Sequence, residues 1–156
     1  MKNLGELLAK SWLDKTFLNL DTLNAKDIPS TRKEAFEAQN FFYQSINKKT
    51  VGWKIGAVAK EVQEEEGYDG PVPGKIFEDS FLQINTNIDF NDIPHSNLEC
   101  EYALQFLKDS KIDNELDKDL NQIKLFTAID ITSTRYEQTS KDKFDKLIQM
   151  KQLLDQ

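Results

Sequence analysis

The chain has 156 residues and a mass of 18.0 kDa, which is the size of one domain with a sizeable core. Hydrophobic residues make up 38% and charged residues 30%, with 6 glycines and 4 prolines, which excludes collagen-like, low-complexity and disulfide-scaffold proteins. A net charge of −7 without a lysine or arginine stripe argues against a nucleic acid or an anionic membrane as partner. A single cysteine, together with the lack of an apolar run suited to a membrane span or signal peptide, favours a cytoplasmic protein.

Residues 1–48 are predicted to form a helical segment. A second helix in this segment is predicted to begin after Thr31, because Glu34 follows it at the spacing of a capping box. Both helices show apolar residues at three- and four-residue spacing, which is typical of one buried face. The predicted buried face of the first helix consists of Leu4, Leu7, Leu8, Trp12, Leu13 and Phe17. That of the second consists of Ala35, Ala38, Gln39, Phe42, Tyr43 and Ile46.

Residues 49–156 are predicted to form a β-rich region within the same single domain. Strands are predicted over residues 50–58, 75–81, 98–106 and 124–132, which are rich in β-branched and aromatic side chains. A short helix over residues 59–66 is expected to end at Gly67 and to lead into a turn-rich loop over residues 67–74. Two more helices are predicted, one through Leu116, Leu120 and Ile123 and one over residues 140–154. Helices first and a mixed sheet afterwards indicate an α+β fold.

Acidic residues interrupt two of the predicted strands. Alternation places Glu99 and Glu101 on one face of the 98–106 strand, while Asp130 lies within an apolar run of the last strand. A buried carboxylate is costly unless it is paired, protonated or bound to a cation. All three carboxylates are therefore candidate ligands of one divalent cation. Solvated glutamates, and an Asp130 that pairs with Arg135 or caps a helix, are open alternatives. The opposite, predicted core face of the 98–106 strand consists of Leu98, Cys100, Tyr102, Leu104 and Phe106.

Lys54 is the candidate catalytic amine. It shares its strand face with Gly52 and Gly56, and glycine inside a strand often marks the close approach of a ligand. The alternative is an exposed lysine on a bulged edge. His95, the only histidine, is expected to lie on the surface, and Cys100 is expected to be an inert thiol on the core side.

Four segments resemble, in order, motifs of the 2-keto-4-pentenoate hydratase group of the fumarylacetoacetate hydrolase superfamily. EAFEAQ (residues 34–39) resembles the helix that ends in Ala-Tyr-x-x-Gln. GWKIGAVAKEVQEEEGYDGPVPGKIF (residues 52–77) resembles the Gly-x-Lys-x-Gly strand with the helix and loop that follow it. ECEYAL (residues 99–104) resembles the Glu-x-Glu motif, and AIDITSTR (residues 128–135) the Glu-x-x-x-x-Arg segment.

This resemblance implies a β-roll that holds magnesium or manganese through Glu99, Glu101 and Asp130, with Lys54 as the catalytic residue that moves or orients a proton. The implied activity is that of a hydratase, a hydro-lyase that adds water to small 2-oxo (2-hydroxydienoate) acids in aromatic catabolism. Related members decarboxylate 2-oxo acids or hydrolyse acylpyruvates. Residues that bind the substrate tail are not identified.

Three departures from the family pattern bear on this expectation. Asp130 stands where the family usually has glutamate, which shortens the ligand by about 1.5 Å. Val72 occupies the position of an acid/base aspartate in the hydratases. Family members also continue well beyond Gln156, which predicts a homo-oligomer, a complementing subunit, or a truncated inactive chain that binds a partner.

Overall fold

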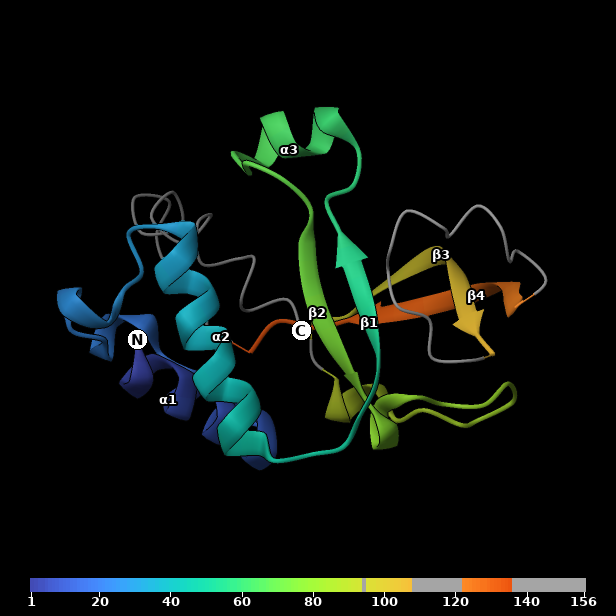
Figure 1. The fold of residues 1–156 in the computed structure, drawn as a ribbon. Helices are drawn as coiled ribbons and strands as arrows, with labels where there is room; N and C mark the ends of the chain where they lie inside the picture. The colour runs from blue at the N-terminus through green and yellow to red at the C-terminus, as the bar shows by residue number, and fades with distance from the viewer. Residues whose placement is uncertain (94, 108–121, 136–156) are drawn as a thin grey trace. The chain divides into compact units, whose positions relative to one another are not determined.

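The computed structural model describes residues 1–93, 95–107 and 122–135 (Figure 1). The helix predicted over residues 140–154, and the positions of Leu116 and Leu120, lie outside these residues. The chain divides into two compact units, Met1–His95 with Ser133–Gln156, and Ser96–Thr132. Each unit is described by itself. Within the described ranges, the helices are too short or too polar to cross a membrane.

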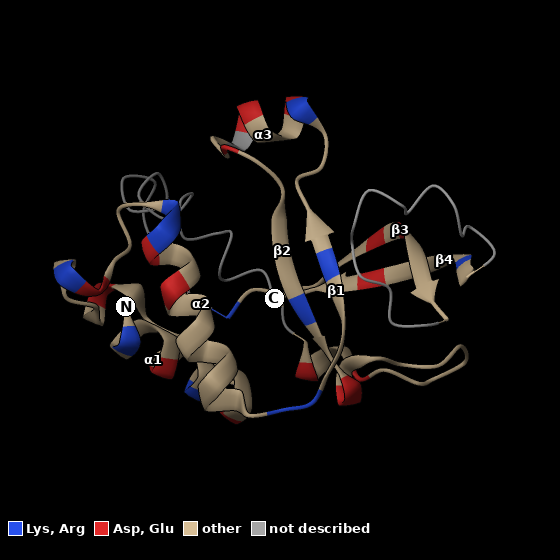
Figure 2. Cartoon of the chain, in the orientation of Figure 1, with Lys and Arg blue, Asp and Glu red and all other residues tan. Residues whose placement is uncertain are grey.

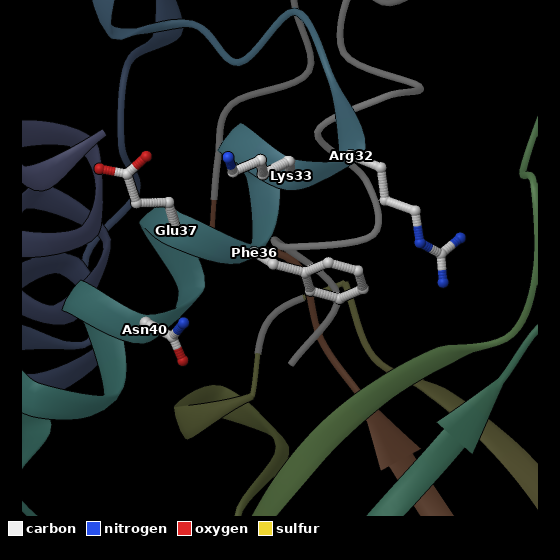
Figure 3. A pocket seen from close by; sticks show the side chains of 5 residues that line it. All are labelled: Arg32, Lys33, Phe36, Glu37 and Asn40. Carbon is white, nitrogen blue, oxygen red and sulfur yellow. The ribbon is translucent and has the colours of Figure 1, made fainter.

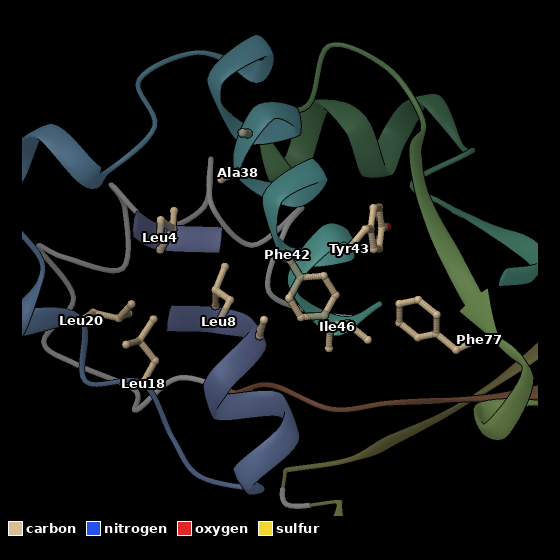
Figure 4. Close-up of a cluster of buried hydrophobic side chains, with 11 residues drawn as sticks. Leu4, Leu8, Leu18, Leu20, Ala38, Phe42, Tyr43, Ile46 and Phe77 are labelled. Carbon is tan, nitrogen blue, oxygen red and sulfur yellow. The ribbon is translucent and has the colours of Figure 1, made fainter. Parts of the chain in front are cut away.

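Two packed helices build the core of the first unit. Helix α1 spans Lys2–Asp14 and helix α2 spans Arg32–Ile46. They meet at Gly5, where an added Cβ would lie 2.4 Å from the Ala38 carbonyl oxygen and 2.6 Å from Phe41 Cβ. Only a residue without a side chain permits this approach. The buried side chains around the contact are Leu4, Leu8, Ala9, Leu18, Leu20, Ala35, Ala38, Phe42, Tyr43, Ile46 and Phe77 (Figure 4).

Helix α2 begins where the capping pattern predicts. Thr31 Oγ1 accepts a hydrogen bond from Glu34 N at 3.2 Å, and the Glu34 carboxylate accepts from both Ser30 N and Ser30 Oγ at 2.7 Å. The carboxylate thus reaches one residue further back than in the standard capping box. The predicted buried face of this helix is confirmed at every position.

The predicted buried face of α1 is partly wrong. The helix ends at Asp14, so Phe17 lies outside it. Leu13 is 50% exposed, because nine positions at about 100° per residue bring it to the side of the helix opposite Leu4. Leu4 and Leu8 are buried against the core, and Leu7 and Trp12 are partly buried there.

The first unit also contains a two-stranded antiparallel sheet. Strand β1 spans Thr50–Gly56 and strand β2 spans Val72–Phe77, with helix α3 (Lys60–Glu66) between them. The left-handed cap expected at Gly67 is confirmed by its φ of 73°. Strand β2 begins three residues earlier than predicted and ends earlier too, at a 3₁₀ turn over Glu78–Ser80. Other 3₁₀ turns span Leu20–Thr22, Ala25–Asp27 and Phe90–Asp92.

The second unit is an antiparallel pair of long strands. Strand β3 spans Asn97–Phe106 and strand β4 spans Ile123–Thr132, with unbroken pairing between them. Both predicted strands are confirmed to within one residue, and Ile123 belongs to β4 rather than to a helix. The predicted core face of β3 is wrong, because its side chains are exposed: Leu98 63%, Tyr102 78%, Leu104 58% and Phe106 53%. Cys100 is exposed as well, so the expected buried thiol is corrected. Alternation shows which side chains share a face, but a two-stranded sheet has no second layer of its own to cover them.

Candidate functional site

The three candidate metal ligands lie on one face of the β3–β4 sheet. Glu99 pairs directly with Asp130, and Glu101, two residues further along β3, pairs with Ala128. Directly opposed residues share a face, as do residues two apart on one strand. Opposed Cβ atoms in such a pair lie about 4.5–5.5 Å apart. We call Glu99, Glu101 and Asp130 the acidic face; Figure 2 marks acidic residues on both strands.

The strands themselves place little positive charge beside the acidic face. Lys124 is the single basic residue of β3 and β4, and it pairs with Gln105 at the far end of the sheet. Six strand positions separate it from Asp130, about 20 Å. Like charges at neighbouring positions repel, so a positive group from outside these two strands would offset that repulsion.

The oxygen atoms of the acidic face do not converge on one point. Glu99 and Glu101 are exposed and Asp130 is half-buried. In the part of the chain that the structure describes, no group of three histidine, cysteine or acidic side chains is arranged to ligate an ion. The donor set nevertheless fits a hard divalent cation in kind, because Mg²⁺ and Ca²⁺ take carboxylate oxygens as ligands. The residue opposite Glu101 is Ala128, whose side chain is a single methyl group.

Lys54 lies in the middle of β1, opposite Gly74 of β2. The irregularity in this sheet falls between Thr50 and Gly52, so Lys54 is regularly paired and not on a bulge. The strand face that carries Lys54 is half-buried, whereas Trp53 and Ile55 on the other face are 57% and 49% exposed.

The glycines beside Lys54 are not required by crowding within the sheet. A Cβ added to Gly52 would lie 3.7 Å from Ile76 Cδ1, and one added to Gly56 would lie 3.8 Å from the Val72 carbonyl oxygen. Both are ordinary contact distances. The two glycines therefore put no side chain beside Lys54 on its face of β1.

A shallow hollow on the first turns of α2 has none of the predicted site residues in its lining (Figure 3). It is lined by Arg32, Lys33, Phe36, Glu37 and Asn40. The Arg32 guanidinium lies 5.0 Å from the centre of the Phe36 ring and donates hydrogen bonds to Asp69 Oδ1 and the Gly70 carbonyl oxygen. The contacts of Arg32 could not be predicted from local sequence patterns, because its partners lie in a loop 37 or more residues away.

Comparison with known proteins gives structural matches only. No protein-family model and no curated protein matches the sequence. Among solved structures, 4-oxalocrotonate decarboxylase from Pseudomonas putida G7, complexed with magnesium and adipate, matches with a TM-score of 0.73 and 17% identity. The same enzyme complexed with calcium and acetate matches with a TM-score of 0.72 and 17% identity. Each match covers 99% of this chain and 59% of the decarboxylase chain.

These matches confirm the expected fold class. The chain has an α+β fold that matches the decarboxylase structure over 99% of its length. It spans 59% of the length of those structures. At 17% identity the likeness establishes a shared fold, and the role of each candidate residue rests on its own geometry.

Proposed function

We propose that this chain provides the metal-binding and proton-transfer residues of a divalent-metal-dependent enzyme that acts on small 2-oxo acids. The observation that carries the proposal is the direct pairing of Glu99 with Asp130, beside Glu101, on one face of β3–β4. The fold supports it, because the matching decarboxylase structures are complexes with magnesium or calcium.

Glu99, Glu101 and Asp130 are the residues that would hold the cation, with Mg²⁺ as the first choice and Mn²⁺ as the second. A bound divalent cation acts as a Lewis acid on a keto oxygen and stabilises the negative charge that develops there. The three carboxylates offset the charge of the ion and leave coordination positions for substrate oxygens.

Lys54 is the proposed proton-transfer residue. An amine can donate a proton to, or take one from, the carbon atom next to a carbonyl group, and such positioned groups contribute about 10²- to 10⁴-fold to a rate. The glycines on either side of Lys54 add no side chain to the space next to it on that face of β1. A side chain in place of either glycine would narrow that space.

Decarboxylation is the reaction that we propose first. The carboxylate that leaves must stand β to the keto group, directly or through a conjugated double bond. Its C–C bond breaks and CO₂ is released, and the bonding electron pair becomes an enolate that Lys54 protonates at carbon. Hydration needs a group that activates water, and Val72, the first residue of β2, has an apolar side chain that cannot do so. Hydration, expected from the sequence, and acylpyruvate hydrolysis are the alternative reactions.

A direct test measures CO₂ release from 2-oxo dicarboxylic acids whose second carboxylate is β to the keto group, directly or through a conjugated double bond, with Mg²⁺ and with a chelator. We expect release to require the metal and to fall by about 100-fold or more in Lys54→Met. Lys60→Met, a lysine on α3, is the matched control and should leave the rate unchanged. Metal-independent release, or Mg²⁺ binding without turnover of any substrate class, would refute the proposed reaction.

A second candidate function is that of a subunit that binds a partner chain. It is favoured by the exposed apolar side chains of β3–β4, among them Leu98, Tyr102, Leu125 and Ile129. Exposed apolar patches of this kind mark interaction surfaces. Sedimentation over a range of concentrations distinguishes a homo-oligomer from a subunit that complements a different chain. Self-association that Ile129→Lys abolishes supports a homo-oligomer, whereas a monomer that binds an apolar dye supports a complementing subunit.

A further inference from the structure

Strand β2 has a helix at the edge where a third strand would otherwise pair. Its other edge pairs with β1. Gln39 Nε2 donates to the Pro73 carbonyl oxygen at 3.1 Å, and Lys75 N donates to Tyr43 Oη at 3.0 Å. Residues two apart on a strand direct their backbone groups to the same edge, so both contacts lie on the edge away from β1. Side chains of α2 thus replace the hydrogen bonds of a neighbouring strand.

The contacts extend along the segment that enters β2. Arg32 donates to Asp69 Oδ1 at 2.6 Å, to the Gly70 carbonyl oxygen at 3.1 Å, and to the Pro71 carbonyl oxygen. Arg32, Gln39 and Tyr43 form one row on α2, because offsets of seven and eleven residues return to nearly the same side of a helix. Eleven helical residues rise about 16.5 Å, which equals the length of about five strand residues at 3.3 Å each. The row therefore follows the chain from residue 70 to residue 75.

Two of the three members of the row, Gln39 and Tyr43, are buried. Gln39 is 5% exposed and Tyr43 is 7% exposed. The Tyr43 ring packs against Phe77 with their centres 6.0 Å apart, and Lys75 Nζ lies 4.6 Å from the centre of the Tyr43 ring. A buried polar group that loses its partner costs more than the hydrogen bond itself contributed, so these two contacts hold β2 firmly.

Gly74, which lies between the two anchored residues Pro73 and Lys75, is the residue opposite Lys54. We propose that Gln39 and Tyr43 are positioning residues that fix the Lys54 amine by holding β2 on both sides of Gly74. The inference rests on the proposed role of Lys54 in proton transfer. The helix segment EAFEAQ, which ends at Gln39, thereby gains a role beyond the core.

The test uses Tyr43→Phe, which keeps the ring, and Gln39→Leu, which keeps the approximate volume. Gln44→Leu, an exposed position of α2, and Tyr102→Phe, an exposed position of β3, are the matched controls. Amide hydrogen exchange at Gly74 and Lys75 should quicken by about tenfold in each positioning variant. The acylation rate of Lys54, measured by mass spectrometry against the other lysines, should change by more than threefold. For CO₂ release, kcat should fall by about tenfold while KM stays within twofold.

If one of these two variants does not fold, the other still tests the inference. Faster exchange with unchanged Lys54 acylation and unchanged kcat would mean that the row is only structural, which overturns the inference. If the wild-type chain does not turn over any 2-oxo acid, the proposed function fails. The exchange and acylation measurements still decide the positioning of Lys54 in that case.

Discussion

Glu99 and Asp130 occupy directly opposed positions in the β3–β4 sheet. Opposed residues of like charge destabilise a strand pair by about 0.2–1 kcal/mol, which distinguishes this pair from the attractive pairs that usually stabilise a sheet. A cation bound at the acidic face, as proposed above, would offset this repulsion.

We expect Glu101→Gln to weaken Mg²⁺ binding by about tenfold or more, because a neutral amide oxygen is a poorer ligand for a hard dication than a carboxylate. Isothermal titration of Mg²⁺ and Mn²⁺ into wild type and variant measures the change. Glu61→Gln, an acidic residue of α3, is the control and should bind as wild type does. Equal affinity in Glu101→Gln and wild type would remove Glu101 from the ligand set.

Glu99→Gln should have opposite effects with and without metal. Without divalent ions it removes one of two opposed charges and should raise the free energy of unfolding by about 0.5 kcal/mol. With saturating Mg²⁺ the wild type should be the more stable protein, because binding to the folded state adds stability. Urea unfolding with and without Mg²⁺ measures the difference in the free energy of unfolding between Glu99→Gln and wild type in each buffer. An unchanged order in both buffers would contradict the cation-binding role.

Gly5→Ala should destabilise the helical core although alanine is the better helix former by about 1 kcal/mol. The added methyl group would meet the Ala38 carbonyl oxygen at 2.4 Å, and the two backbones must separate to relieve that contact. Overpacking of this kind costs about 1–3 kcal/mol, so we expect a net loss in urea unfolding. Lys2→Ala, an exposed position of α1, should change stability by less than about 0.5 kcal/mol. Equal stability of Gly5→Ala and wild type would show that the helices separate easily.

The start of α2 should become less stable in acid. Hydrogen bonds from the Ser30 side chain and backbone lower the pKa of Glu34 below its usual value of 4.5. A carboxyl group with a lowered pKa contributes stability above pH 4.5 and loses that contribution as the pH falls through its folded-state pKa. Glu34→Gln should therefore unfold more easily than wild type at pH 7, and the difference should shrink toward pH 3. Thermal unfolding at both pH values tests this; a difference that grows in acid would contradict it.

Local patterns predicted the elements that depend on local rules. The cap at Thr31 and the buried face of α2 follow from side-chain spacing within one helix, and both are confirmed. The start of β2 did not follow, because proline and glycine at positions 73 and 74 are typical of a loop. Pro73 is accommodated in the strand because its carbonyl oxygen accepts a hydrogen bond from Gln39 at the edge away from β1. No hydrogen bond to β1 is needed from the Pro73 nitrogen, which has no hydrogen to donate.

The candidate site was predictable residue by residue but not as an arrangement. Alternation placed Glu99 and Glu101 on one face, yet the pairing of Glu99 with Asp130 depends on the register of two strands that are distant in sequence. The exposure of Leu98 and Tyr102 could not be predicted either, because the same alternation occurs in strands whose apolar face is covered and in strands whose apolar face is exposed. The metal-ligand roles and the role of Lys54 remain predictions.

The pairing of Asn97 with Thr132 brings the first and last residues of the β3–β4 sheet together. Paired residues lie about 4.5–5.5 Å apart at Cα, so the polypeptide departs from the sheet next to the point at which it enters. Among the residues that the structure describes, the hydrophobic core of the helical unit runs from Leu4 to Phe77, before the β3–β4 sheet begins. The β3–β4 hairpin is therefore one continuous segment whose two ends lie side by side. A short turn in its place should leave a folded helical scaffold, and the hairpin of another protein of the same fold can be grafted onto that scaffold.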